Sequence, residues 1–186
     1  MASEVSICNQ ALQKLGASRI TSLTEDSRNA RAVNACYVEM RDAELRAHPW
    51  NFGRKRVVLS PDSTAPVFDY GYAFTLPTDC LRPLPPARTG LDWQIEGGKI
   101  LTNDGTTINL RYVRRVADPN EMDPCFRDMV ACRIAAQVCE EITQSNTKLE
   151  SIQAAYKMSK LEAKRANAFE QNSDDPPDDT WITARL

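Results

Sequence analysis

The chain has 186 residues and a formal net charge of −2 at pH 7, from 23 Lys and Arg against 25 Asp and Glu. Its length fits one domain, or one domain with an insertion, whose core needs no disulfides. The near-neutral charge argues against a general nucleic-acid binder. No apolar run approaches the roughly 20 residues of a membrane span. The start, Met1-Ala2-Ser3-Glu4, lacks the features of a signal peptide, so we expect a cytosolic protein unless a larger assembly carries it out.

Two helices are predicted before residue 50. Ser3 is a suitable N-cap for the first helix, and Gly16 stands where a C-terminal glycine belongs. The second helix starts after one of three capping candidates, Thr24, Asp26 or Ser27, and stops at Pro49. Its apolar spacing places Glu44 on the inner side and Arg41 on the outer side.

Two further helices are predicted in the last third of the chain. Asp123-Pro124 is a favourable start for the third helix. That helix is apolar nearly all round, so we expect it to be central and to have partners on several sides. The fourth helix follows residues 145–147, is amphipathic, and is expected to pack against the third.

The middle of the chain predicts strands. Residues 54–59 form a first strand, and residues 70–76 alternate aromatic with small residues, as in a strand with one aromatic packing face. Residues 78–82 are expected to turn into the proline-rich stretch 83–86, which does not suit a central strand. Gly97-Gly98 predicts a hairpin between residues 91–96 and 99–102, and residues 108–112 form a last strand. We expect an antiparallel meander with local connections.

These patterns predict an α+β fold. A helical domain, similar to a four-helix bundle, comprises residues 1–53 and 118–170, and residues 54–117 form an inserted β domain. Trp50 and Phe52 are expected where a helix end meets the sheet. Residues 171–186 form a flexible C-terminal tail whose acidic, proline-rich run, residues 174–179, cannot build a core. Trp181 follows that run and must either fold back on its own domain or dock on another chain.

The sequence offers few residues for catalysis or metal binding. Six cysteines include no CxxC pair, and the last three recur every seven residues, as buried side chains on one helix stripe do. The single histidine, His48, precedes a proline at a helix end, where a surface or interface role outweighs that of a general base. No nucleophile elbow, P-loop or dinucleotide-binding motif is present. We therefore expect no enzyme activity, no metal and no cofactor.

Two alternatives remain open from the residues alone. A nucleic-acid-binding module would use Arg111, Arg114 and Arg115, and the aromatic strand of residues 70–74 could stack bases. A cell-wall hydrolase carried on a virion would need carboxylates, for which the sequence offers scattered candidates: Asp69, Asp79 and Asp92.

Several pieces of the chain resemble, in order, the tail tubular protein A family, the head-to-tail adaptors of short-tailed phages. The two most specific are His48-Pro49-Trp50-Asn51-Phe52 and Leu76-Pro77-Thr78-Asp79-Cys80-Leu81-Arg82. The others, by number, are residues 9–12, 15–17, 20–23, 41–42, 45, 55–56, 70–74 and 181–185. Residues 83–116 carry little resemblance.

The resemblance implies a structural role. Family members form a dodecameric ring beneath the portal, bridge it to the tail nozzle, and let the genome pass through their channel without specific binding. It implies a location in the virion neck after assembly in the host cytoplasm. The tail is expected to dock on the portal through its last residues, and four residues near the sheet are further structural or interface candidates. The docking residues are Trp181, Ile182, Arg185 and Leu186, and the interface candidates are Trp50, Phe52, Arg54 and Arg56.

Overall fold

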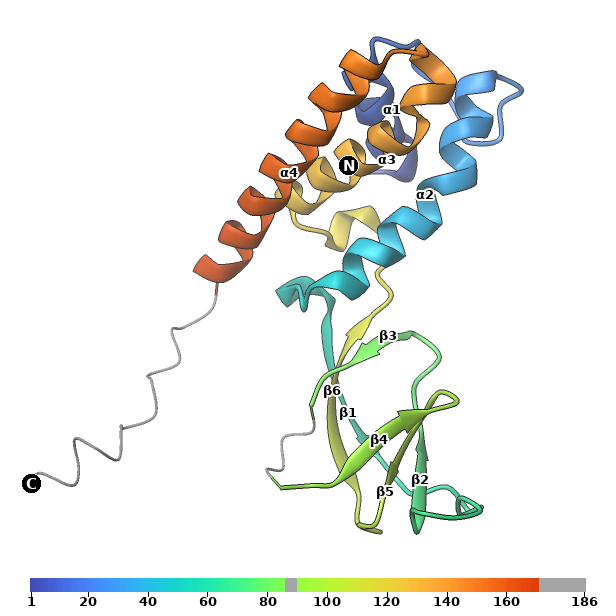
Figure 1. The fold of residues 1–186 in the computed structure, drawn as a ribbon, viewed down its shortest axis with the longest axis vertical. Helices are drawn as coiled ribbons and strands as arrows, with labels where there is room; N and C mark the ends of the chain where they lie inside the picture. The colour runs from blue at the N-terminus through green and yellow to red at the C-terminus, as the bar shows by residue number, and fades with distance from the viewer. Residues whose placement is uncertain (86–89, 171–186) are drawn as a thin grey trace, which may run out of the picture.

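A computed structural model describes residues 1–85 and 90–170 of the chain. These residues contain four α-helices and two small antiparallel sheets of three strands each, which confirms the α+β class. Figure 1 shows the helices gathered at one end of the molecule and the strands at the other, with β1 and β6 running between the two parts. No helix within these residues has the length and apolar content needed to cross a membrane.

The predicted helix ends are confirmed. Helix α1 spans Glu4–Leu15, between a capping box at Ser3 and a left-handed Gly16 with φ of 77°. Helix α2 spans Arg28–Ala47, and the Ser27 side chain accepts a hydrogen bond from the Ala30 N–H at its start. His48, which precedes Pro49, has the extended φ of −140° that ends the helix.

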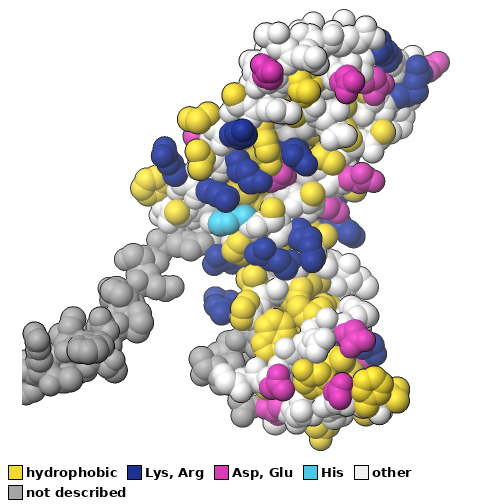
Figure 2. Space-filling view, viewed as in Figure 1, with side chains coloured by type: hydrophobic (Ala, Val, Ile, Leu, Met, Phe, Trp, Pro, Cys, Tyr) yellow, Lys and Arg dark blue, Asp and Glu magenta, His cyan; other side chains and the backbone are white. Residues whose placement is uncertain are grey.

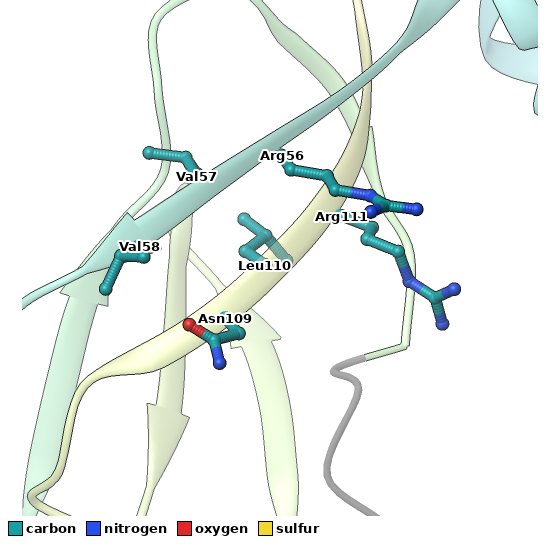
Figure 3. Close-up of a pocket in the computed structure, with 6 residues that line it drawn as sticks. All are labelled: Arg56, Val57, Val58, Asn109, Leu110 and Arg111. Carbon is teal, nitrogen blue, oxygen red and sulfur yellow. The ribbon is translucent and has the colours of Figure 1, made fainter.

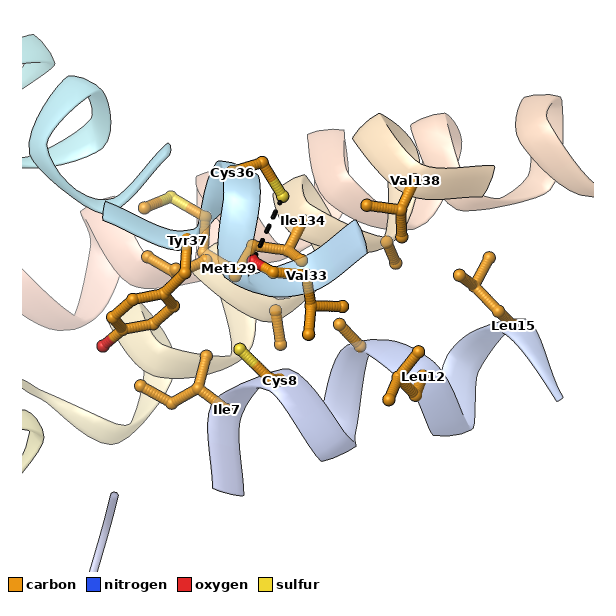
Figure 4. Packing of buried hydrophobic residues seen from close by; sticks show 14 of the residues in the cluster. Ile7, Cys8, Leu12, Leu15, Val33, Cys36, Tyr37, Met129, Ile134 and Val138 are labelled. Atoms are coloured by element: carbon orange, nitrogen blue, oxygen red, sulfur yellow. Dashed lines mark hydrogen bonds between the residues drawn. The ribbon is translucent and has the colours of Figure 1, made fainter. Parts of the chain in front are cut away.

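Helix α3 spans Pro124–Thr143 and is central, as its all-round apolar pattern predicts. Helices α1, α2 and α4, which spans Asn146–Phe169, all pack against it. Figure 4 shows the apolar side chains of α1 facing those of α2 and α3. One prediction for α2 is wrong. Arg41 is only 4% exposed, because Asp42 and Glu4 pair with its guanidinium and the Tyr37 ring lies under it.

The strands form two sheets rather than one meander. Their bounds are Arg54–Leu59 for β1, Tyr72–Thr75 for β2, Cys80–Pro83 for β3, Trp93–Glu96 for β4, Lys99–Thr102 for β5 and Ile108–Arg114 for β6. The strand orders are β1-β6-β3 and β2-β5-β4, so most pairings join strands far apart in the sequence. Only the β4–β5 hairpin, with positive φ at Gly97 and Gly98, is local as predicted. The prediction of a meander is therefore wrong.

The two sheets enclose a second, smaller core. Phe74, Ile100, Ile108, Leu110 and Tyr112 are buried there together. Three strands alone cannot bury an apolar face from water, so each sheet covers the other. This packing explains why strand β1 pairs with β6, the last strand, instead of with its neighbour in the chain.

Two local predictions for the strands also need correction. Residues 80–82 belong to the stretch 78–82 predicted as a turn, but together with Pro83 they form strand β3, which pairs with β6. Strand β3 lies at the edge of its sheet, in agreement with the prediction that the proline-rich stretch is not a central strand. The aromatic face predicted for residues 70–76 is divided. Phe74 is buried, whereas Tyr72 is 42% exposed and covers Gly105, where an added Cβ would lie 2.4 Å from the Tyr72 ring.

Candidate interface on the basic face of the sheet

The junction between helices and sheet is built around Trp50. Its side chain is 1% exposed, and its ring contacts Phe126 edge-on at 5.1 Å and stacks on Phe52 at 6.3 Å. The indole N–H donates to the backbone carbonyl of Glu44 at 2.9 Å. Trp50 is therefore an internal anchor of the junction, and Phe52 is half-buried beside it.

One face of the β1-β6-β3 sheet collects arginines from all three strands. Arg54 and Arg82 are both paired with Val113, and Arg56 lies directly opposite Arg111. Paired residues and residues two apart on a strand share one face of a sheet. We call Arg54, Arg56, Arg82 and Arg111 the basic face. Figure 3 shows Arg56 and Arg111 extending to the same side.

The arginines of the basic face have no acidic partners among residues 1–85 and 90–170. Arg54 donates to the Pro49 carbonyl at 3.0 Å, and Arg82 donates to the Ala47 carbonyl at 3.4 Å, at the negative end of the α2 dipole. Neither the Arg56 guanidinium nor the Arg111 guanidinium donates a hydrogen bond to a residue within that part of the chain. Their positive charges are therefore uncompensated there.

His48 lies in a positive electrostatic potential where the basic face meets the helices. Burial lowers the pKa of His48, and the nearby cations Lys164, Arg54 and Arg82 lower it further. Its ring lies edge-on to Trp50 at 4.7 Å, and a ring nitrogen is 3.4 Å from the Asn167 amide. Figure 2 shows Lys and Arg side chains gathered around this histidine, where the helices meet the strands.

A hollow of about 640 Å³ opens on the basic face. The described residues that line it are Arg56, Val57, Val58, Asn109, Leu110 and Arg111. Val58, which is paired with Asn109, is 63% exposed there. Arginine binds carboxylates and phosphates in a bidentate manner. A surface that combines arginine with exposed aliphatic groups therefore suits an anionic segment that carries apolar groups beside its charges.

The nucleic-acid cluster predicted from Arg111, Arg114 and Arg115 is not assembled. Arg114 pairs with Glu121, and Arg115 pairs with Asp42 at 2.8 Å, so carboxylates neutralise both. Only Arg111 belongs to the uncompensated face. Sequence reasoning missed Arg82 as its neighbour, because the strand that carries Arg82 was predicted as a turn.

The carboxylates of the hydrolase alternative show no catalytic arrangement in the described part of the chain. Asp79 accepts hydrogen bonds from the Tyr112 hydroxyl at 2.9 Å and from Lys55 at 3.1 Å. Partial burial raises the pKa of Asp79, but these two hydrogen bonds outweigh it and lower the pKa below its ordinary value. Such a carboxylate is a poor proton donor at neutral pH. Asp69 lies in a loop with φ of 69°, and Asp92 precedes β4.

A buried polar cluster joins α2, α3 and α4 behind the junction. Glu44 is 4% exposed and accepts hydrogen bonds from the Tyr156 hydroxyl and from Lys160, the latter at 3.0 Å. Arg133 lies 4.0 Å from the same carboxylate and 5.4 Å from the centre of the Tyr156 ring. The inward position of Glu44 is predictable from helical spacing, but its partners are not.

One of the two most specific family-like motifs, residues 76–82, contacts the end of α2 directly before the other motif, residues 48–52. The guanidinium of Arg46, two residues before His48, donates to the Leu81 carbonyl, and Arg82 donates to the Ala47 carbonyl. The segments are about thirty residues apart in the chain, yet β3 packs against the end of α2. The four residues predicted to dock on a portal, Trp181, Ile182, Arg185 and Leu186, lie outside the described residues.

No protein-family model matches the sequence, and no curated protein matches it.

Proposed function

We propose that the chain is a non-catalytic structural subunit, a head-to-tail adaptor of a short-tailed phage virion. Copies would form a dodecameric ring between the portal and the tail nozzle, in the virion neck, through which DNA is retained and ejected. The observation that carries the proposal is the contact between the motif at residues 76–82 and the end of α2, directly before the motif at residues 48–52. The residues that most resemble the adaptor family together build the junction between the helices and the sheets.

The elongated arrangement supports a bridging role. Helices at one end and sheets at the other offer two chemically different surfaces to two different partners. In this proposal the helices act as a bundle that contacts the portal and neighbouring subunits. The sheets face a neighbouring copy or the nozzle. The end of the tail reaches the portal ring through Trp181, Ile182, Arg185 and Leu186.

Exposed apolar side chains on α4 support contact with a second copy. Met158, Leu161 and Phe169 are all exposed, at 58%, 51% and 88%. Their spacing of three and eight residues places them on one stripe of the helix. The opposite side of α4, which includes Ile152 and Ala163, is buried against the rest of the protein. A ring neighbour that covers this stripe would remove it from water.

Native mass spectrometry and electron microscopy of the chain, alone and with the portal protein encoded by the same genome, test the proposal. We expect a closed ring of copies on the portal. A chain that stays monomeric and does not bind the portal would contradict it. Cell-wall zymography is a separate check. A cleared band that disappears with Asp79→Asn would favour the hydrolase alternative instead.

A further inference from the structure

The basic face lacks a counter-charge within the part of the chain that the structure describes. Arg56 and Arg111 lie directly opposite each other across two hydrogen-bonded strands. Like charges in that position repel and destabilise the strand pair. Arg54 and Arg82 add two more positive charges on the same face. The surface therefore favours an anionic partner that carries several charges along an extended backbone.

The chain itself contains such a partner sequence. Residues 174–179 read Asp-Asp-Pro-Pro-Asp-Asp, four carboxylates in six residues. Two consecutive prolines favour an extended polyproline conformation, which separates the two aspartate pairs along one line. Four carboxylates equal the four arginines of the basic face in number and are opposite to them in charge.

Helix α4 ends next to the start of β1. The Asn51 N–H donates to the Asn167 side chain at 2.7 Å, and the Asn51 amide donates to the Asn167 carbonyl at 2.8 Å. The same amide lies 3.1 Å from the Glu170 carboxylate. The end of α4 at Glu170 therefore lies beside Asn51, which is three residues before Arg54 in the chain.

The residues that follow α4 are long enough to reach from Asn51 to Arg56 on the basic face. A stretch of four residues, from 170 to 174, spans at most about 14 Å, and the nine residues to 179 span at most about 32 Å. The five residues from Asn51 to Arg56 span at most about 18 Å. The acidic run can thus lie along the basic face without any rearrangement of the helices.

We propose that residues 174–179 of the same chain bind the basic face, with their carboxylates paired to Arg56 and Arg111. This inference goes beyond the adaptor function and does not depend on it. A tethered segment has a high effective concentration at a nearby site, so it outcompetes free anions. The bound segment then shields the face from phosphate-bearing polymers such as duplex DNA.

The test uses the full chain with Asp174, Asp175, Asp178 and Asp179 all changed to Asn. We expect the backbone amide NMR signals of β1 and β6 to shift between this variant and the wild type, and 0.5 M NaCl to produce similar shifts in the wild type. The shifts should not depend on protein concentration. Unchanged β1 and β6 signals would overturn the proposal. Shifts that vanish on dilution would assign the segment to a second copy and overturn it as well.

Binding of a labelled 20-base-pair duplex at low salt provides the second measurement. Loss of the acidic segment should tighten duplex binding roughly tenfold, because the arginines become available to phosphates. Adding Arg56→Gln and Arg111→Gln should abolish that gain, whereas Arg28→Gln with Arg31→Gln, at the far end of α2, should preserve it. Equal duplex binding by wild type and the Asp→Asn variant would show that the segment does not occupy the face. Ring formation on the portal is a separate readout, so the two proposals can fail independently.

Discussion

The indole nitrogen of Trp50 lies 2.9 Å from the backbone carbonyl oxygen of Glu44, six residues earlier in the chain. This hydrogen bond turns residues 49–53 back over the last turns of α2. The same tryptophan packs on Phe126 of α3. One side chain therefore fixes the direction in which the chain leaves the helices and enters β1.

Replacing Trp50 should destabilise the whole protein. We expect Trp50→Ala to lower the free energy of unfolding by about 3–5 kcal/mol, since it leaves a large cavity. Trp50→Phe should cost about 1–3 kcal/mol, since the ring is smaller and the hydrogen bond is lost. Urea unfolding measures both. Phe169→Ala, at an exposed aromatic residue, is the matched control and should change the free energy by less than about 0.5 kcal/mol.

Tyr156→Phe tests the cluster around Glu44 through its dependence on pH. Burial and then the Glu44 carboxylate raise the pKa of Tyr156 above its ordinary 10.0. A group that keeps its proton better in the folded state stabilises fully below its unfolded pKa, and this contribution is lost as pH rises through the folded pKa. We expect the free energy of unfolding of the wild type to exceed that of Tyr156→Phe by about 1–2 kcal/mol at pH 7. This difference should decrease above pH 10.

Lys160 acts in the same direction within this cluster. Burial lowers the pKa of Lys160, but hydrogen bonds with Tyr156 and Glu44 outweigh burial and raise it above 10.5. Buried Cys8 and Cys36, with pKa values raised to about 12 and about 11, also lose stabilising contributions at high pH, in both proteins. The comparison therefore uses the difference between wild type and variant in urea unfolding at each pH. A gap that stays constant from pH 7 to pH 11 would refute the role of the Tyr156 hydroxyl.

Thiol reactivity should divide the six free cysteines into two groups. Cys8, Cys36, Cys132 and Cys139 are buried, whereas Cys80 and Cys125 are half-buried. Burial raises the pKa of Cys8 to about 12, so it forms little of the reactive thiolate at pH 8. We expect a disulfide reagent at pH 8 to modify Cys80 and Cys125 in the native protein and all six in guanidinium. Rapid native modification of Cys8 would contradict the packing of α1 on α2.

Reversing one of the two opposed charges, at Arg56 or at Arg111, should stabilise the protein. In the Asp→Asn background, which removes the acidic segment, Arg56→Glu should stabilise the protein by about 0.2–1 kcal/mol, because opposite charges then face each other. Arg111→Glu should have the same effect, and the double reversal should lose it. Thermal unfolding at low salt measures the cycle. Additive effects of the two changes would mean that the side chains do not interact.

Trp181→Ala tests the proposed portal contact, because large aromatic residues dominate many interfaces. We expect weaker association with the portal and an unchanged melting temperature of the isolated chain. Thr183→Ala, in the same segment, serves as the control for a small polar position. If Trp181→Ala instead lowers the melting temperature by several degrees, Trp181 packs on its own domain.

Many features of the fold were predictable because their causes are local. Ser3, Ser27 and Asp123 cap helices through hydrogen bonds to N–H groups two or three residues away. Pro49 ends α2 through a clash with the residue before it. Gly97 and Gly98 permit the one hairpin between consecutive strands. The central position of α3 also followed from its own apolar pattern.

The tertiary structure alone decided how the strands pair and which charges meet. Sheet pairing depends on which apolar faces cover each other. Strand β6 therefore pairs with both β1 and β3, whereas local patterns predicted a meander of consecutive strands. That pairing places Arg54, Arg56, Arg82 and Arg111 on one face while Arg114 and Arg115 find carboxylates. The sequence by itself determined helices, caps and composition, since these depend on near neighbours. The basic face required long-range contacts, which no local pattern encodes.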